Sequence, residues 1–152
     1  MPKKKIIIYT DGGARGNPGN AGSGAYITYE DGHVIKECYK ALGVQTNNYA
    51  EYYAVILGLE NLKKIFGTEK LKDFDIEIKM DSELVQRQLS GKYQMKAEHF
   101  FPLFMRIWNL RVADFPNLKF THVPREQNKE ADRLSNVAMD EGEKVHKNLF
   151  DK

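Results

Sequence analysis

One stretch near the start of the chain limits the possible folds most strongly. Residues 6–18 read IIIYTDGGARGNP, so the continuous apolar run 6–10 leads directly into Asp11 and two glycines. An uninterrupted apolar run is typical of a strand that is covered on both faces. We therefore predict that residues 6–10 form a central strand, that this strand ends at Asp11, and that the glycines keep the space around its carboxylate open.

The rest of the chain predicts an α/β protein with a mixed sheet flanked by helices. Asp31 and Gly32 form a strong hairpin signal between two strands, and the polar residues from Thr46 onward are suited to start a helix. The further predicted strands are 25–29, 34–41, 75–81 and 118–123, and the predicted helices are 46–66, 82–89, 97–112 and 127–141. The first three strands have antiparallel linkage and the later strands alternate with helices, so the sheet should be mixed.

Length, charge and cysteine content narrow the class of protein. The 152 residues fit one domain, and 23 Lys and Arg against 21 Asp and Glu give a formal net charge of +2, which neither demands nor excludes a polyanionic partner. Cys38 is the only cysteine, and no Cys/His spacing typical of a zinc site is present. The first apolar run is too short for a signal peptide or a membrane span. We predict a cytoplasmic monomer without membrane association, made of a basic tail (1–4), one domain (5–141) and a charged C-terminal tail (142–152).

Three carboxylates occupy unusual positions in this pattern. Glu51 heads the apolar stripe of the predicted helix 46–66, where a carboxylate is costly unless it is hydrogen-bonded, paired or bound to a cation. Asp11 and Asp81 each end a predicted strand, and ligand sites in open α/β sheets gather beyond the carboxyl ends of strands. Taken singly, each has a structural interpretation: Glu51 as a partner of the helix dipole, Asp11 as a turn residue and Asp81 as a helix cap. Together they predict an all-oxygen site for Mg²⁺ or Mn²⁺.

Four blocks of sequence, taken together, resemble the type 1 ribonuclease H family, whose members cut RNA that is paired to DNA. The blocks are YTDGGARGNPG, TNNYAEYYAV, MDSELV and HVPREQNKEADRLSN, and the likeness extends from about Lys5 to Asp140. The resemblance implies a ribonuclease H-like fold with a five-stranded mixed sheet, three antiparallel strands followed by two parallel ones. It also implies four catalytic, metal-binding carboxylates, which are Asp11, Glu51, Asp81 and Asp132. Periodicity alone would leave Asp132 as a solvated residue of the last helix.

The same resemblance implies a mechanism and a substrate. Two Mg²⁺ ions, with Mn²⁺ as an alternative, would serve hydrolysis of the RNA strand of an RNA/DNA hybrid, leaving 5′-phosphate and 3′-hydroxyl ends. Gly12, Asn17, Asn47 and Asn48 would line the minor groove of the hybrid, and Thr46 would help to hold a phosphate of the DNA strand. Without the resemblance, Asn17 is an ordinary turn residue before a proline, and the cluster 46–48 is an ordinary helix start.

The sequence also departs from the family pattern. Some members carry a basic, Trp-rich protrusion, whereas the corresponding segment here is short and richer in phenylalanine than in lysine. Its aromatic residues, predicted mainly as core or helix-packing residues with stacking on nucleic acid as the alternative, are Phe100, Phe101, Phe104 and Trp108. Glu83 stands where many relatives have Gln, which leaves hydrogen bonding to a base open at that position. His122 alternates with Leu118 and Phe120, which favours a strand residue held by packing over the loop histidine of many relatives.

Two other classes of function stay open at this stage. An ATPase or sugar kinase of the same broad superfold would use a strand followed by Asp-Gly-Gly to cradle phosphates, but such proteins usually need two domains of this kind. A non-catalytic hybrid-binding module would share the fold, although the presence of all four carboxylates argues against it. The domain could also derive from a retroelement.

Overall fold

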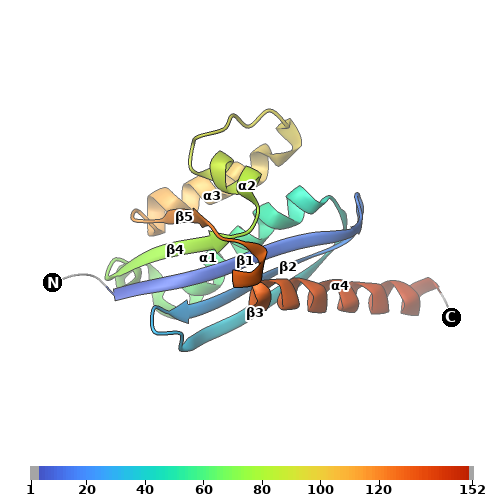
Figure 1. Ribbon diagram of the computed structural model, residues 1–152, viewed down its shortest axis with the longest axis horizontal. Coiled ribbons are helices and arrows are strands. Elements are labelled where there is room, and N and C mark those ends of the chain that lie inside the picture. The colour runs from blue at the N-terminus through green and yellow to red at the C-terminus, as the bar shows by residue number, and fades with distance from the viewer. Residues whose placement is uncertain (1–3, 151–152) are drawn as a thin grey trace.

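The predicted five-stranded mixed sheet with flanking helices is confirmed. A computed structural model describes residues 4–150, with side chains up to residue 145. The strand order is β3-β2-β1-β4-β5; β1 is antiparallel to β2 and β2 to β3, whereas β4 is parallel to β1 and β5 to β4 (Figure 1). In chain order the elements are β1 (Lys4–Gly16), β2 (Gly19–Tyr29), β3 (Val34–Gln45), α1 (Asn47–Leu71), β4 (Phe74–Met80), α2 (Glu83–Leu89), the 3-10 helix η1 (Glu98–Phe100), α3 (Phe101–Asp114), β5 (Lys119–His122), the 3-10 helix η2 (Arg125–Gln127) and α4 (Lys129–Phe150).

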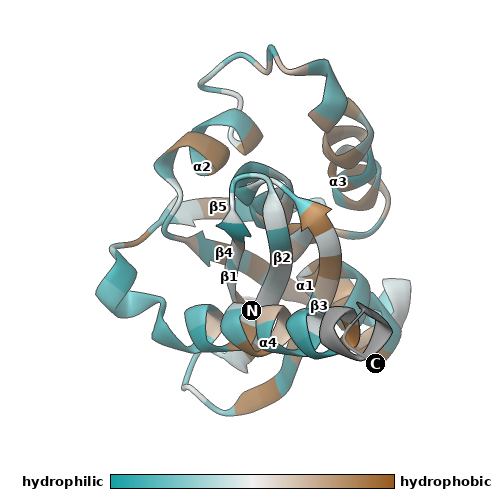
Figure 2. Cartoon of the chain, turned by 90° about the vertical axis from the view of Figure 1, so that its right-hand side faces the viewer, coloured by the Kyte–Doolittle hydropathy of each residue, from teal (hydrophilic) through white to brown (hydrophobic). Residues whose placement is uncertain are grey.

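Helices cover both faces of the sheet, as the apolar run in β1 requires. Figure 2 shows α4 on one side of the strands and α2 and α3 on the other. Ile8 of β1 is fully buried and faces α1, where a Cβ on Gly58 would lie 2.7 Å from its side chain. On the opposite face, a Cβ on Gly24 of β2 would lie 2.6 Å from both the Ala131 carbonyl oxygen and the Ser135 nitrogen of α4. Only glycine at this position allows α4 to approach the sheet so closely.

The central strand does not end at Asp11 as predicted. β1 continues to Gly16 and pairs with β2 along its whole extension, down to the pair Gly16 and Gly19. This pairing satisfies backbone N–H and C=O groups that a loop would leave to solvent, although the glycine-rich segment shows no apolar periodicity. β4, however, pairs with β1 only as far as Thr10 and Met80. Asp11 therefore lies where β1 loses one of its two neighbours.

Several element boundaries also differ from the sequence prediction. The predicted end of the first helix before Gly67 coincides with a break in α1, where the backbone of Gly67 is non-helical with φ at 78°, and a second helical stretch that was not predicted continues to Leu71. α4 continues to Phe150, so residues 142–150 of the predicted charged tail are helical. Lys4 already belongs to β1, and residues 1–3 of the predicted basic tail lie outside the described part of the chain.

Of the aromatic residues before and within α3, some lie in the core and others on the surface. Phe100 is buried and Phe104 partly buried in the core, as predicted. Phe101 and Trp108, in contrast, are 42% and 51% exposed, so the core interpretation was wrong for these two. They lie on the face of α3 that points away from the buried residues Leu103 and Ile107.

Within residues 4–150, no helix combines the length and the apolar character that a membrane crossing would require.

Candidate active site

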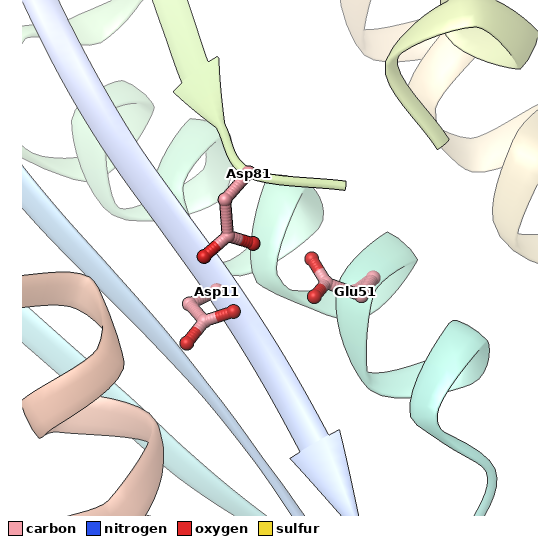
Figure 3. Close-up of side chains that lie close together, drawn as sticks. All are labelled: Asp11, Glu51 and Asp81. Atoms are coloured by element: carbon pink, nitrogen blue, oxygen red, sulfur yellow. The ribbon is translucent and has the colours of Figure 1, made fainter. Parts of the chain in front are cut away.

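Three carboxylates meet at the point where β1 and β4 stop pairing. Asp11 comes from β1, Asp81 follows directly after β4, and Glu51 comes from α1 (Figure 3). One carboxylate oxygen from each residue lies within 4.8 Å of the other two. The predicted convergence of these three side chains is therefore present in the structure.

Local backbone geometry explains how Glu51 reaches the sheet. A Cβ on Gly12 would lie only 2.2 Å from the carbonyl carbon of Ala50, so the first turns of α1 pack directly onto the backbone of β1. Thr46 caps this helix, because its hydroxyl accepts the N–H of Tyr49 at 3.2 Å. Glu51 is the fifth residue of α1, 9% exposed, and no acidic residue lies in the first turn. The interpretation of Glu51 as a partner of the helix dipole is thus wrong.

The capping role considered for Asp81 also belongs to another residue. The hydroxyl of Ser82 accepts the N–H of Val85 at 3.3 Å and caps α2. The carboxylate of Asp81 is therefore available to the cluster.

Burial and mutual repulsion shape the protonation of the cluster. Burial raises the pKa of Asp11 to about 7, and the nearby negative charge of Asp81 adds to this shift. Burial likewise raises the pKa of Glu51, and the charges of Asp11 and Asp81 raise it further. Glu51 Oε2 is also buried without a hydrogen-bond partner among the described residues. Negative charge on Asp11 and Glu51 is therefore unfavourable unless a cation binds beside them.

Asp132 lies in the same cleft but outside the tight cluster. It belongs to the first turn of α4, is exposed, and lines a cleft of about 550 Å³ together with Asp11, Glu51 and Asp81. The structure thus places all four predicted carboxylates around one cleft.

Ser135 and Arg125 are among the cleft residues that the sequence analysis did not identify as site residues. Ser135 is 1% exposed; its hydroxyl donates to the main-chain oxygen of Asp132 at 2.8 Å and lies 3.4 Å from Asp11 Oδ2. Its spacing of three residues from Asp132 places both on one helix face, which is a signal that the sequence did contain. Arg125, between the predicted strand 118–123 and the predicted helix 127–141, belongs to η2, lines the cleft and brings a positive charge to it.

The predicted substrate contacts gather beside the cleft, around the start of α1 and the tip of the β1–β2 hairpin. Asn17 Oδ1 accepts the N–H of Asn47 at 3.0 Å, and Asn47 Oδ1 accepts the N–H of Ala14 at 2.8 Å. Gly12 and Asn47 line the cleft itself. Asn48 is partly buried in the first turn of α1, next to the cap residue Thr46.

His122 does not have the packed environment predicted for it. It is the last residue of β5 and its side chain is exposed, whereas the next residue, Val123, is buried. The pairing of β5 with β4 ends at Met80 and His122, and the N–H of Val123 then bonds to the Met80 carbonyl at 2.8 Å. The alternation of Leu118 and Phe120 therefore does not extend to this position, and His122 does not line the cleft.

Comparisons with known proteins agree with this geometry. Residues 9–138 match the family model described as Reverse transcriptase-like. A bifunctional protein of Mycobacterium tuberculosis is 40% identical over 137 residues, which are 90% of this chain and 36% of that protein. A ribonuclease H of Desulforamulus reducens is 30% identical over 141 residues, which are 89% of this chain and 87% of that protein. This chain spans 36% of the length of the mycobacterial relatives it matches.

A solved structure gives a similar result for the fold. LC11 ribonuclease H1, in complex with an RNA/DNA hybrid, is similar to this chain with a TM-score of 0.85 at 48% sequence identity. The match covers 90% of this chain and 97% of that chain.

Proposed function

Because this chain belongs to the ribonuclease H family, we propose that it hydrolyses the RNA strand of RNA/DNA hybrids and leaves 5′-phosphate and 3′-hydroxyl ends. The observation that carries the proposal is the cleft itself, in which Asp11, Glu51 and Asp81 converge and Asp132 faces them from α4. The similarity to a ribonuclease H1 that binds such a hybrid supports the choice of substrate.

The donor set fits divalent metal ions. All four groups offer oxygen ligands, which suits Mg²⁺, with Mn²⁺ as an alternative, better than zinc. The unpartnered Oε2 of Glu51 and the raised pKa of Asp11 both indicate a site that needs a cation. We assign Asp11, Glu51, Asp81 and Asp132 to holding two Mg²⁺ ions. When bound, two such ions supply Lewis acidity at the scissile phosphate and a nucleophilic hydroxide at neutral pH.

The protein's own residues then have separate tasks. Asp11, Glu51 and Asp81 come from three different elements, so the fold fixes their mutual geometry before any substrate binds. Arg125 lines the cleft on the side of the β5–α4 connection, where its charge can attract a phosphate of the substrate. This arrangement restricts cleavage to a backbone that lies across the carboxylate cluster.

We assign strand discrimination to the residues beside the cleft. The Oδ1 atoms of Asn17 and Asn47 accept main-chain N–H groups, so the amide N–H groups of these side chains are what they can offer to base acceptors in a minor groove. Gly12 and Asn48 lie next to them, and we assign Thr46 to contact with a phosphate of the DNA strand. The 2′-hydroxyl is the group that distinguishes the RNA strand at such a site.

A labelled hybrid tests the proposal. We expect endonucleolytic cuts in the RNA strand with Mg²⁺ or Mn²⁺, and none with EDTA or on duplex RNA or duplex DNA. Digestion of the products by an exonuclease that requires a 5′-phosphate tests whether the phosphate remains on the 5′ end of each cleaved product. Binding of the hybrid without cleavage under both metals would instead support a non-catalytic module, and metal-dependent ATP hydrolysis would support the ATPase alternative.

We further propose that the protein acts as a monomer in the cytoplasm. Its one cysteine, Cys38, is buried in β3 and has no cysteine partner within the chain, as is common in a reducing compartment.

A further inference from the structure

Asn128 occupies the junction of the three segments that carry the cleft residues Asp11, Arg125 and Asp132. It lies between η2 and α4 and is 1% exposed. Its main-chain N–H donates to the Arg125 carbonyl at 3.0 Å, and its main-chain carbonyl accepts the N–H of Asp132 at 3.1 Å. Its main chain thus bonds to neighbouring residues, whereas its side chain extends to the central strand β1.

The side-chain contact of Asn128 ends on the residue before Asp11. Asn128 Nδ2 donates to the main-chain oxygen of Thr10 at 2.9 Å, and both residues are buried. Thr10 is the last residue of β1 that pairs with β4, so the bond is made where the sheet stops supporting the strand on that side. Because a carbonyl accepts and cannot donate, this contact requires a side-chain donor, which here is the amide nitrogen of Asn128.

Asn128 does not cap α4 with its side chain, as an asparagine before a helix usually does. Such a residue usually caps the helix by accepting an N–H of the first turn with its Oδ1. The Oδ1 of Asn128 is buried and accepts no hydrogen bond among the described residues. The contact across to Thr10 is therefore the polar bond that this side chain makes.

A second contact between α4 and β1 lies close to this hydrogen bond. Asn128, Asp132 and Ser135 are spaced i, i+4 and i+7, so they share one face at the start of α4. Ser135 lies 3.4 Å from Asp11 Oδ2, and Asn128 bonds to Thr10, so Asp132 stands between two connections to β1. This geometry fixes the separation of the Asp11 and Asp132 carboxylates, which come from elements far apart in the sequence.

We propose that Asn128 is a positioning residue, whose bond to Thr10 sets the spacing of Asp11 and Asp132 and thereby the affinity of the cleft for divalent metal ions. This inference rests on the proposed function for its link to catalysis. Outer partners of metal ligands typically change metal affinity or activity by about 10- to 100-fold when they are lost.

The test uses two variants and a matched control. Asn128→Ser introduces a hydroxyl that can cap α4, which the wild-type side chain does not do, but cannot reach Thr10, and Asn128→Ala makes neither contact. Asn61→Ala is the control, because Asn61 Nδ2 also donates to a main-chain oxygen, that of Leu57 at 2.8 Å, on α1 and outside the cleft. For each protein, the rise in Tm with Mg²⁺ concentration gives the metal affinity without any need for activity.

We expect both Asn128 variants to bind Mg²⁺ at least about tenfold more weakly, and kcat to fall at saturating hybrid while KM for the hybrid changes less than about threefold. Asn61→Ala should lower Tm without changing either quantity. Lower Tm with unchanged Mg²⁺ affinity and kcat in the Asn128 variants would overturn the proposal. If Asn128→Ala does not fold, Asn128→Ser decides. If the wild type binds Mg²⁺ but does not cleave hybrid, the proposed function is wrong. The comparison of Mg²⁺ affinities still tests whether Asn128 positions the carboxylates.

Discussion

Asp11 shows how a single side chain can serve function at the expense of stability. It is 7% exposed and shares its surroundings with two other carboxylates, so its ionised form is disfavoured without a cation. We expect Asp11→Asn to abolish cleavage and, in EDTA, to leave Tm unchanged or raise it, because the amide removes a repelling charge. Thermal unfolding and the hybrid assay check both expectations.

Asp75→Asn is the control for this substitution, because Asp75 is an exposed carboxylate at the opposite end of β4. It should leave both cleavage and Tm essentially unchanged. A clear drop in Tm for Asp11→Asn in EDTA would mean that the carboxylate stabilises the metal-free fold.

The same residue gives the metal-free protein a defined dependence on pH. The pKa of Asp11 rises from 3.8 to about 7 on folding, so the folded state binds more protons than the unfolded chain between these values. The free energy of unfolding should therefore fall as pH rises from about 4 to 7, and Glu51, whose pKa is also raised, acts in the same direction. Glu77 and Asp114 have lowered pKa values and act in the opposite direction, at lower pH.

Comparing wild type with Asp11→Asn in EDTA isolates this contribution. We expect the Tm of the wild type to decrease more than that of the variant between pH 5 and pH 7, and Mg²⁺ to remove the difference because it binds the ionised form. Parallel Tm profiles for the two proteins would show that Asp11 does not titrate in this range.

Among the elements, α4 depends on glycines in β2 for its position. A Cβ on Gly24 would meet the backbone of α4 at 2.6 Å, so Gly24→Ala must push the helix away from the sheet or distort it. Overpacking of this kind typically costs about 1–3 kcal/mol. We expect Gly24→Ala to lower Tm and also kcat, because α4 carries Asp132 and Ser135. Circular dichroism melting and single-turnover kinetics measure the two effects.

Gly13→Ala is the matched control for this element. The added Cβ would lie 3.5 Å from the Met139 side chain, which is ordinary contact, and it meets no backbone. Similar losses in the two variants would indicate that any methyl group on this face is harmful, independently of the position of α4.

The sequence predicted the helices and strands that have strong apolar periodicity. It did not predict strand ends that depend on pairing with residues distant in the sequence. The apolar run in β1 predicted a central strand, but its glycine-rich extension to Gly16 is held by pairing with β2, which no local pattern records. Glu51 and Asp81 stood out because a charge interrupts an apolar pattern. Asp132 did not, since an exposed carboxylate on a helix looks like any solvated residue. The environment of His122 was predicted wrongly because this residue ends β5 with an exposed side chain, although it continues the alternation of Leu118 and Phe120.

At the scale of the whole molecule, the low net charge limits the electrostatic part of the affinity for an RNA/DNA hybrid. The formal net charge is only +2, and Arg15, which lines the cleft, is already paired with Asp140 and Glu143 at 2.8 Å. We expect hybrid binding to weaken only gradually with salt, with a slope in log affinity against log salt of about −3 or shallower. Fluorescence anisotropy with the Asp11→Asn variant measures this on intact hybrid, and a slope near −6 would reveal a basic surface outside the cleft.

The order of the carboxylates along the chain has a consequence for biosynthesis. Asp11, Glu51 and Asp81 are all present once the ribosome has made β4 and the residue after it, whereas Asp132 and Ser135 arrive only with the last helix. Until α4 docks, Gly24 and its neighbours on β2 face solvent, and the carboxylate cluster lacks its fourth member. A chain that stops before α4 therefore carries Asp11, Glu51 and Asp81 without Asp132 and Ser135, and the synthesis and docking of α4 complete the cleft.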